Sequence, residues 1–571
     1  MTRETTISEY LIQGLQKAGV DHIFGIPGDY VIKFFSELEK SSIETIGTCS
    51  EQGAAFAADA YSRVHGIGAL CVTFSVGGLN TVNAVAGAYA EKAPLIVISG
   101  APGVCERNTD YLLHHSVKDL NSQLNIFKEV TVAQCVLDDP QSAPYEIDRV
   151  IAACLKHKRP VYIEFPRDMI HSKCLIPPPK TEIISSKSNE IFNEALKEAV
   201  EMIKAAKKPV ILAGVEIRRY HVENEFLKLL ENTGFPYVTN VLGKSVICES
   251  HPQYLGVYMG KMGDPEVIKY IEESDCTIIL GALMTDTDTG TTQFNISKTI
   301  YASSDEFCIK HHYFKDIDLG EFIYRLAQEL KADCEQRLKG QLGCSETQFI
   351  ASNQASEKKE NLLIPKTANN SKDAEYIAQS ETPMTIKRFF KRLNSFIPEG
   401  SPIICDVGDC LFGSATLKIP KDSVYLGPAF YTSMGYAIPA TLGVMIKNPE
   451  LRSLVIVGDG AFQMTGPELS CFVKYNLNPI IFVLNNKGYT TQRYLKDGNY
   501  NDIHNWNYHL FPQIVGSGLG IEVKTEGEFE EALQKAENNT ESFTIINIHL
   551  DKYDKSDTLY RLTSMLGKNV V

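Results

Sequence analysis

Two runs of apolar residues near the carboxyl end of the chain have the length and composition of buried strands. Residues 454–457 run directly into Gly458-Asp459-Gly460, and residues 480–484 end at Asn485-Asn486. About two dozen residues of helical character separate these motifs, which predicts one parallel βαβ crossover. The polar ends of both strands should therefore emerge at the same edge of a sheet, as a ligand site.

The same order of elements is predicted near the amino end. Residues 70–74 are predicted as a strand, Gly77-Gly78 as a turn, 80–91 as a helix and 95–99 as a second strand. A proline, Pro94, breaks the chain before this second strand, and Pro479 stands in the corresponding place in the later region. The sequence therefore predicts two related α/β domains.

A third α/β unit is predicted between them, with helices over 193–205 and 223–232 and strands over 209–212 and 276–280. Pro177-Pro178-Pro179 begins one linker, and a second tract rich in Ser, Asn, Lys and Glu is too polar to bury a core. We therefore expect an α/β fold of three domains, with parallel sheets flanked by helices. The expected domains are 1–180, 190–342 and 382–571, with a linker over 343–381.

Composition excludes several classes of function. The formal charge of −14, from 56 basic and 70 acidic residues, argues against nucleic-acid binding. Residues 1–14 are expected to form an amphipathic helix and lack the apolar core of a signal peptide, and no run approaches the roughly 18 apolar residues of a membrane span. The 14 cysteines include no Cys-x-x-Cys pair, which predicts reduced thiols in a cytoplasmic protein.

Candidate chemistry gathers at the sheet edge after residues 457 and 484. Asp459 offers a carboxylate oxygen, Asn486 an amide oxygen and Gly488 a backbone carbonyl, which suit the octahedral coordination of Mg²⁺ together with phosphate and water oxygens. Gly458 and Gly460 would let a diphosphate approach the backbone at the N-terminus of the next helix. Taken alone, Gly-Asp-Gly also occurs in ordinary turns.

The spacing of Gly458-Asp459-Gly460 and Asn485-Asn486 resembles the cofactor motif of thiamine-diphosphate enzymes. Residues 85–92, 127–134, 406–412 and 457–466 extend the resemblance over nearly the whole chain, toward the bacterial phenylpyruvate and indolepyruvate branch of the 2-oxo acid decarboxylases. It implies thiamine diphosphate and Mg²⁺ as cofactors, and pyrimidine-binding, middle and diphosphate-binding domains in that order. Further cofactor-binding positions that it implies are Gly408, Asp409, Thr432, Met434, Ala461 and Tyr489.

By the same resemblance, the carbonyl of Thr432 would accept a hydrogen bond from the aminopyrimidine of the cofactor. Met434 would prop the cofactor into its bent shape. A methionine in core packing is the alternative for Met434.

Four titratable residues in the first domain sharpen the resemblance. Glu51, beside an Ala-rich helix, matches the glutamate that activates the aminopyrimidine. Asp29 and the pair His114-His115 match the aspartate loop and tandem histidines of non-oxidative 2-oxo acid decarboxylases, and could relay the proton that is needed after CO₂ leaves. Taken singly, the same residues would fit a helix N-terminus, a turn and a polar loop.

The chain departs from the pyruvate decarboxylases at Gln492, where they carry a catalytic glutamate. An amide can form hydrogen bonds but cannot exchange a proton near pH 7. The phenylpyruvate branch also lacks that glutamate and resembles this chain at Asp286, which could supply the missing carboxylate. A helix-capping role for Asp286 remains equally open.

The resemblance implies decarboxylation of a 2-oxo acid to an aldehyde and CO₂ through an enamine on the cofactor. Leu411 is smaller than the Trp of some relatives, which favours aryl substrates such as phenylpyruvate or indolepyruvate, or branched-chain ones. The alternatives are a carboligase, which slow protonation at Gln492 would favour, and a non-catalytic homologue that binds the cofactor. The family arrangement implies a homodimer or homotetramer, because the pyrimidine-binding domain of one chain faces the diphosphate-binding domain of its partner.

Overall fold

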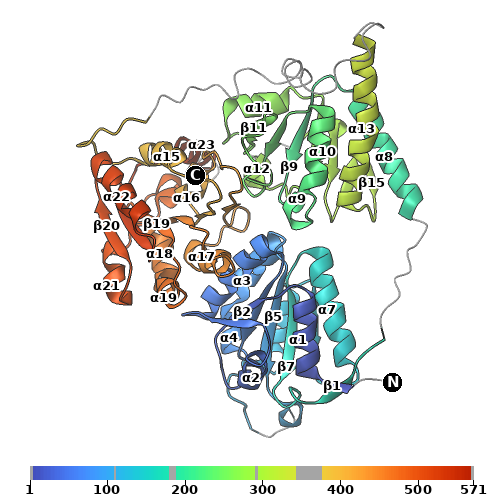
Figure 1. The fold of residues 1–571 in the computed structure, drawn as a ribbon, viewed down its shortest axis with the longest axis vertical. Helices are drawn as coiled ribbons and strands as arrows, with labels where there is room; N and C mark the ends of the chain where they lie inside the picture. Colours follow the sequence, from blue (N-terminus) through green and yellow to red (C-terminus); the bar gives the residue numbers. More distant parts are fainter. Residues whose placement is uncertain (1–3, 108–110, 179–187, 290–293, 342–375, 567–571) are drawn as a thin grey trace.

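The computed structural model describes residues 4–107, 111–178, 188–289, 294–341 and 376–566, which form three α/β domains (Figure 1). The predicted linker over 343–381 lies outside these residues except for 376–381. Where the sequence predicts one helix over 1–14, the chain instead forms strand β1 (Glu4–Thr6) and then helix α1 (Ile7–Lys17). The helix begins late because Thr6 caps it: the Thr6 hydroxyl accepts from the Glu9 amide, and the Glu9 carboxylate accepts from the Thr6 amide.

The N-terminal domain is built on a six-stranded parallel sheet with strand order β3-β2-β4-β5-β7-β6. The strands are β2 (His22–Gly25), β3 (Glu44–Gly47), β4 (Gly68–Val72), β5 (Leu95–Ala101), β6 (Ala133–Val136) and β7 (Val161–Pro166). The helices include α2 (Ile32–Leu38), α3 (Glu51–His65), α4 (Val76–Asn80), α5 (Val82–Ala90), α6 (Ser122–Lys128) and α7 (Ala143–His157). Strands β4 and β5 are buried throughout, which explains their continuous apolar sequences.

The C-terminal domain repeats this topology. Its parallel sheet has the order β17-β16-β18-β19-β21-β20, so that the strands of both sheets, numbered within each domain, follow the order 2-1-3-4-6-5. The strands are β16 (Ile403–Cys405), β17 (Tyr425–Leu426), β18 (Leu454–Gly458), β19 (Ile480–Asn485), β20 (Leu519–Val523) and β21 (Thr544–His549). The predicted crossover is confirmed, because β18 and β19 are parallel neighbours.

The middle domain has a seven-stranded sheet of order β11-β10-β9-β12-β13-β14-β15. Its strands are β9 (Pro209–Ala213), β10 (Tyr237–Thr239), β11 (Tyr254–Val257), β12 (Cys276–Leu280), β13 (Thr299–Ala302), β14 (Phe307–Ile309) and β15 (His312–Phe314). The main helices are α8 (Ser188–Ala205), α10 (Glu223–Thr233), α11 (Pro265–Glu272) and α13 (Leu319–Gln341). The pairs β13–β14 and β14–β15 are antiparallel, and the other strand pairs of the sheet, including β12–β13, are parallel. The predicted α/β class of three domains is thus confirmed.

The predicted turn at Gly77-Gly78 is also wrong, whereas the predicted helical character between β18 and β19 is confirmed. Gly77 and Gly78 do not form a turn but lie within α4, and they are glycines because neighbouring side chains approach closely: a Cβ on Gly78 would lie 2.1 Å from Gln123 Oε1. The helical segment between β18 and β19 is not continuous. It divides into α18 (Asp459–Thr465), the 3₁₀ turn η4 (Gly466–Glu468) and α19 (Leu469–Lys474), because Pro467 has no amide hydrogen to continue the first helix.

Helix α3 packs against α17 (Ala437–Met445) of the C-terminal domain. A Cβ on Gly443 would lie 1.9 Å from the carbonyl oxygen of Ala57, so the two helices touch through their backbones. The alanines of α3 and the apolar residues of α17 belong to one buried cluster that includes both sheets. The N- and C-terminal domains of one chain therefore share a core.

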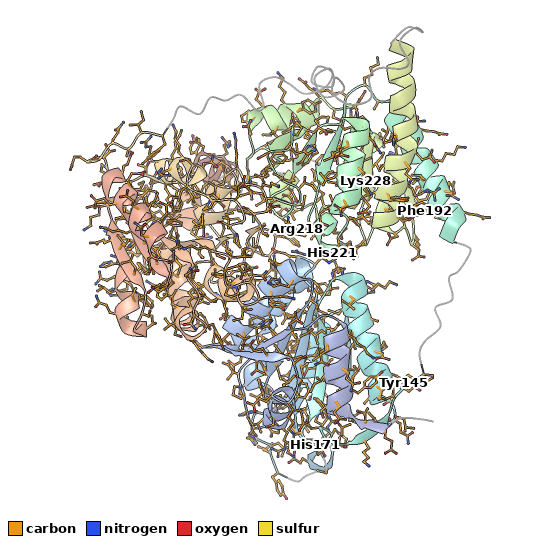
Figure 2. The ribbon with its side chains drawn as sticks, in the orientation of Figure 1. Tyr145, His171, Phe192, Arg218, His221 and Lys228 are labelled. Atoms are coloured by element: carbon orange, nitrogen blue, oxygen red, sulfur yellow. The ribbon has the colours of Figure 1, made fainter. Side chains whose placement is uncertain are left out.

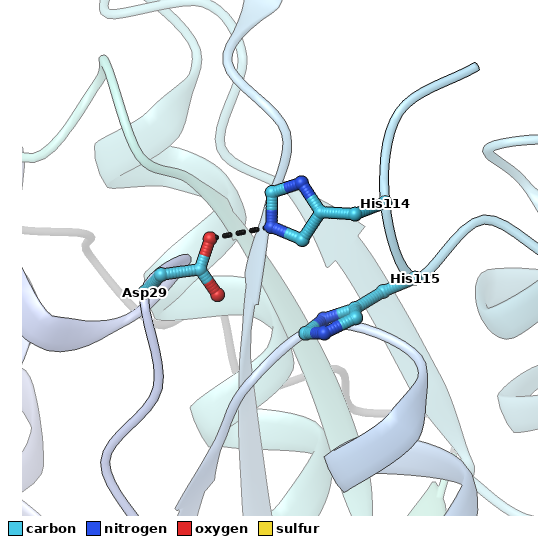
Figure 3. A group of neighbouring side chains, drawn as sticks. All are labelled: Asp29, His114 and His115. Atoms are coloured by element: carbon cyan, nitrogen blue, oxygen red, sulfur yellow. Dashed lines mark hydrogen bonds and ion pairs between the residues drawn. The ribbon is translucent and has the colours of Figure 1, made fainter.

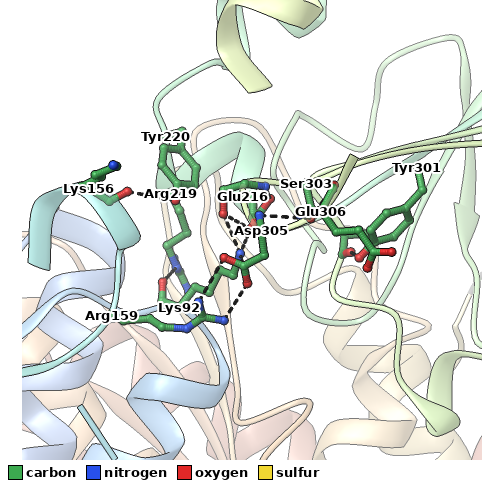
Figure 4. Close-up of polar contacts among 12 residues, drawn as sticks. Lys92, Lys156, Arg159, Glu216, Arg219, Tyr220, Tyr301, Ser303, Asp305 and Glu306 are labelled. Carbon is green, nitrogen blue, oxygen red and sulfur yellow. Dashed lines mark hydrogen bonds and ion pairs between the residues drawn. The ribbon is translucent and has the colours of Figure 1, made fainter. Parts of the chain in front are cut away.

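Buried charges join the middle domain to the N-terminal domain. Figure 2 places Arg218 and His221 at the end of the middle domain that faces the N-terminal domain, and Figure 4 shows the neighbouring network. Lys92 pairs with Glu216 and lies 3.0 Å from Asp305, which also pairs with Arg159 at 2.8 Å. Because buried charges are tolerated only when paired, this network fixes how the two domains meet.

The cysteines of the described residues are free thiols, in agreement with the prediction. Most are buried, whereas Cys49 and Cys105 are exposed. None of the described helices combines the length and apolar character that crossing a bilayer requires.

Candidate active site

The C-terminal sheet changes its direction of growth at strand β16. The chain adds β17 on one side of β16 and then crosses over to add β18 on the other side. Loops at such a point of an α/β sheet diverge, and ligands bind there at the carboxyl ends of the strands. The loops here carry Gly408 and Asp409 after β16 and Asp459 after β18. The predicted cofactor residues therefore gather where this architecture binds ligands.

Asp459 opens helix α18 and is 1% exposed. Its Oδ1 accepts from the Gly460 amide at 2.7 Å, and its Oδ2 accepts from the Gly488 amide at 3.1 Å. Burial raises the pKa of this carboxyl to about 6, and the backbone donors offset the shift only in part. A divalent cation beside Asp459 would favour the ionised carboxylate, so Asp459 is well suited to act as a metal ligand.

Asn486 follows strand β19, and its Oδ1 is buried without a hydrogen-bond partner among the described residues. The backbone around it is held by Arg493, which sequence reasoning missed: Arg493 Nη1 donates to the Asn486 carbonyl at 3.2 Å and Nη2 to the Lys487 carbonyl at 2.7 Å. A buried amide oxygen without a donor is a favourable ligand for a hard cation. Asp459 and Asn486 thus fit Mg²⁺.

Glycines around these ligands serve two purposes. Gly488 has φ +141°, and a Cβ there would lie 2.0 Å from the Asn501 carbonyl, so the chain itself requires glycine. Gly460 is required because the ring of Tyr489 lies against it, 2.4 Å from where a Cβ would stand. At Gly458, however, a Cβ would meet only Cys410 Sγ at 3.9 Å. That open space fits the approach of a diphosphate.

Gly408 has φ +88° and precedes Asp409 at the start of α16 (Asp409–Ser414). The Asp409 carboxylate accepts from the Ser556 amide at 2.7 Å and from the Ser556 hydroxyl, and burial raises its pKa to about 6. Asp409 therefore fastens the segment that leads into α23 (Asp557–Leu566). Ala461, in the first turn of α18, is buried in the core shared by the two domains.

The loop that contains Thr432 and Met434 adopts an unusual backbone. Thr432 has φ +55°, which is uncommon for a β-branched residue and typical of functional loops. Asp406, a fully buried residue at the end of β16, holds the next turn: its carboxylate accepts from the Gly435 amide at 3.1 Å and from the Ala437 amide at 2.8 Å. Met434 is only partly buried against the core. Asp406 thus fixes the position of Met434.

Glu51 lies in the first turn of α3, which Ser50 caps by accepting from the Gly53 amide. Glu51 Oε2 accepts from Asn80 Nδ2 at 2.8 Å, and Oε1 lies 3.5 Å from where a Cβ on Gly77 would stand. Nearby, Thr73 Oγ1 is buried without a partner among the described residues. Glu51 therefore lies beside the loop that follows β4, the strand that corresponds to β18.

Asp29, His114 and His115 form one cluster, as Figure 3 shows. His114 Nε2 lies 2.7 Å from Asp29 Oδ2, and the His114 ring stacks on Tyr30 with centroids 4.6 Å apart. The His115 ring lies edge-on to that of His114, and its Nδ1 is buried without a partner in the described part of the chain. These groups can pass a proton from a carboxylate through an imidazole.

Arg167 contacts this cluster, although its role was not predicted from the sequence. Its Nη1 lies 3.6 Å from Asp29 Oδ2, and its guanidinium lies 4.8 Å from the centre of the Tyr30 ring. The guanidinium thus contacts both the carboxylate and the ring on which His114 stacks. Nothing in the local sequence signals the contact, because Arg167 follows strand β7, far from Asp29 along the chain.

Gln492 and Asp286 lie in different domains. Gln492 is exposed on α20 (Thr490–Leu495), and Asp286 is exposed at the start of α12 (Asp286–Thr289) in the middle domain. No hydrogen bond joins the two side chains in the described part of the chain. Asp288, rather than Asp286, is the buried carboxylate of this loop: it accepts from Asn240 and Thr285, and burial raises its pKa to about 6.

The predicted residues thus fall into two groups within one chain. Asp459, Asn486 and Gly488 form one group on the C-terminal sheet, whereas Asp29, His114 and His115 lie with Glu51 on the N-terminal domain. No hydrogen bond or ion pair between described residues links Glu51 with Asp459.

Comparison with known proteins gives matches along most of the chain. Residues 5–125, 196–330 and 406–548 match the N-terminal TPP-binding, central and C-terminal TPP-binding domains of thiamine pyrophosphate enzymes. An indole-3-pyruvate decarboxylase of Azospirillum brasilense is 34% identical over 97% of both chains. A probable pyruvate decarboxylase of Schizosaccharomyces pombe is 30% identical over 97% of this chain and 95% of its own, and an alpha-keto-acid decarboxylase of Mycobacterium avium is 30% identical over 96% and 94%.

Proposed function

This chain belongs to the thiamine pyrophosphate-dependent 2-oxo acid decarboxylases, and we propose that it converts an aryl or branched-chain 2-oxo acid to the aldehyde and CO₂. The cofactors of this family are thiamine diphosphate and Mg²⁺. The observation that carries the proposed chemistry is the pairing of Asp29 with His114 beside His115, because an aldehyde-forming decarboxylase must return a proton to carbon. The name of the indole-3-pyruvate decarboxylase supports an aryl substrate.

The proposed cofactor site lies on the C-terminal domain. Asp459, Asn486 and the Gly488 carbonyl would hold Mg²⁺, and the loops at Gly408, Asp409, Gly458, Gly460 and Ala461 would receive the diphosphate. Tyr489 would support the Gly460 turn against which its ring packs. Thr432 and Met434 would orient the aminopyrimidine. When bound, thiamine diphosphate supplies the carbanion that adds to the keto carbon and accepts the electrons left when CO₂ departs.

The N-terminal domain would provide the groups for proton transfer. Glu51 would hold a proton at the aminopyrimidine, and its bond from Asn80 fixes the carboxylate for that purpose. Asp29 and His114 would deliver the proton to the product carbon, with His115 as the neighbouring imidazole. Arg167 is a positioning residue, because it contacts Asp29 and Tyr30. Asp286 and Gln492 are proposed as an acid-base group and a substrate-contacting residue of this site.

A homodimer or a dimer of dimers would complete the site in a cytoplasmic enzyme. No hydrogen bond or ion pair within the described part of the chain joins Glu51 to Asp459, whereas the proposed chemistry requires both groups on one cofactor. The N-terminal domain of one chain would therefore face the C-terminal domain of its partner. Sedimentation of the active species tests this arrangement, because an active single chain would contradict it.

The function is tested by incubating the purified chain with thiamine diphosphate, Mg²⁺ and a panel of 2-oxo acids from pyruvate through branched-chain acids to phenylpyruvate and indolepyruvate. We expect CO₂ and aldehyde in equal amounts, with the highest kcat/KM for an aryl or branched-chain acid. Carboligation is the second candidate, favoured by the Gln492 amide in place of a carboxylate. Ligated product exceeding aldehyde would support carboligation, and no CO₂ from any acid would indicate a non-catalytic homologue.

A further inference from the structure

Two thiols and one carboxylate lie together where the N- and C-terminal domains of one chain meet, outside the proposed cofactor site. Cys49 precedes helix α3, whereas Glu468 ends η4 and Cys471 lies on α19. One ligand atom from each, the two Sγ atoms and a carboxylate oxygen, lie within 4.8 Å of one another. The cluster thus combines donors from both domains.

The spacing of the donors suits a tetrahedral ion. A zinc-class cation bound to thiolate sulfur at about 2.3 Å and carboxylate oxygen at about 2.1 Å would hold these two atoms about 3.6 Å apart. Cys471 Sγ lies 3.4 Å from Glu468 Oε2, close to that separation. Cys49 Sγ lies 3.0 Å from the hydroxyl of Ser470. A water molecule beside this hydroxyl would supply the fourth ligand of the ion. Little movement would be needed to accept the ion.

The surroundings of the cluster favour a cation. Cys471 is buried, and burial together with Glu468 and Cys49 raises the pKa of its thiol. Glu468 is also buried and accepts from the Cys49 and Ser50 amides, both at 3.0 Å, so its carboxylate is held in place. Lys474 lies near Gly47 and interacts electrostatically with both thiols, but no ion pair between described residues joins it to Glu468. A divalent ion would replace the thiol protons and balance the carboxylate.

We propose that Cys49, Glu468 and Cys471 bind one thiophilic divalent cation of the zinc class, at a site separate from that of Mg²⁺. Two S–H protons leave to solvent as two metal–sulfur bonds and one metal–oxygen bond form, with no change of oxidation state. The ion would fasten the loop that presents Glu51 to helix α19 of the same chain. It would thereby stabilise the contact between the two domains.

The test uses Co²⁺ as a spectroscopic probe on the full chain saturated with thiamine diphosphate and Mg²⁺. We expect one Co²⁺ per chain with sulfur-to-cobalt charge-transfer absorption, which an oxygen-ligated Mg²⁺ site cannot produce, and Zn²⁺ should displace it. Cys49→Ala and Cys471→Ala should each weaken this binding at least about tenfold. Cys105→Ala is the matched control, because Cys105 is also an exposed cysteine of the N-terminal domain.

Thermal melts separate ion binding from misfolding. Zn²⁺ should raise the Tm of the wild-type chain and of Cys105→Ala, but not that of Cys49→Ala, whose exposed position tolerates alanine. Absence of charge-transfer absorption in the wild-type chain would overturn the proposal, as would its persistence in the double variant Cys49→Ala/Cys471→Ala. Formation of a Cys49–Cys471 disulfide in air without uptake of Zn²⁺ or Co²⁺ would also overturn it, in favour of a redox pair.

Discussion

The N- and C-terminal domains have the same strand order but different polar groups at the carboxyl ends of their strands. After β18 and β19 the C-terminal sheet presents Asp459 and Asn486, whose ligand oxygens are buried. The corresponding segment of the N-terminal domain, after β4, carries Thr73 and then Gly77 of α4, which lies beside Glu51. The same topology therefore creates a possible binding site in each domain, and the residues that follow the strands determine the chemistry of each site.

The solvent exposure of the carboxylates also differs between the two domains. The Asp459 carboxylate is almost completely buried, whereas the Asp29 side chain is 46% exposed and that of His114 is 54% exposed. A buried carboxylate with fixed backbone donors suits binding of a cation, and an exposed carboxylate paired with an imidazole suits exchange of protons. The comparison therefore supports the proposed roles, with cofactor binding at the carboxyl ends of the C-terminal strands (the C-terminal edge) and proton transfer at the carboxyl ends of the N-terminal strands (the N-terminal edge).

The largest effect is expected from removing the buried carboxylate. Asp459→Ala should abolish binding of Mg²⁺ and thiamine diphosphate and, with it, detectable turnover, because the proposed diphosphate segments, residues 406–412 and 458–466, contain no Lys or Arg to hold a diphosphate without metal. Titration calorimetry with cofactor and Mg²⁺ measures the binding. Glu450→Ala, an exposed carboxylate of the same domain, is the control. Full turnover of a chelator-treated wild-type sample would refute the metal assignment.

Changing the N-terminal edge should affect turnover and leave binding intact. Glu51→Gln should lower kcat on the order of 10² to 10⁴-fold, the usual contribution of a general acid-base group. Thiamine diphosphate should still bind, because its proposed ligands lie on the other domain. Glu44→Gln, an exposed glutamate on β3, is the matched control. A near-native rate for Glu51→Gln would contradict the proposal that the N-terminal edge carries out proton transfer.

Asp286 and Gln492 test whether proton transfer extends beyond the N-terminal edge. If Asp286 is an acid-base group, Asp286→Ala should lower aldehyde release by about 10²-fold and raise the ratio of ligated to released product when an acceptor aldehyde is added. Gln492→Ala should mainly change substrate preference. Product ratios for these variants and for Glu272→Ala, an exposed carboxylate on α11, provide the measurement. Unchanged rate and ratio in Asp286→Ala would leave the protons to Asp29 and the histidines.

A smaller effect concerns Asp406, which supports the C-terminal edge by accepting from the Gly435 and Ala437 amides. Burial raises its pKa to about 6, above the value near 4 of an unfolded Asp. The folded chain therefore holds the extra proton between these values, so that this group lowers stability as pH rises from about 4 to 6. In cofactor-free protein, the Tm of the wild-type chain should fall more steeply over this window than that of Asp406→Asn. Equal slopes would contradict the assigned pKa.

The sequence was sufficient to predict the buried strands but not how the elements meet. Residues 454–457 and 480–484 are recognisable because strands buried on both faces are continuously apolar, and both runs lie within observed strands. Asp29 and His114 pair across 85 positions, and no local pattern records such a contact. Arg167, Arg493 and Asp406 were missed for the same reason, since each acts through backbone or side chains of other segments. The turn predicted at Gly77-Gly78 was wrong because both close packing and turns favour glycine.

The most direct test of the two complementary edges is a hybrid dimer that contains one Glu51→Gln chain and one Asp459→Ala chain, purified through two different affinity tags. Each parent homodimer should be nearly inactive. If the N-terminal edge of one chain and the C-terminal edge of its partner form one site, the hybrid has one intact site and should recover about half of the wild-type activity. A hybrid as inactive as both parents would contradict the account.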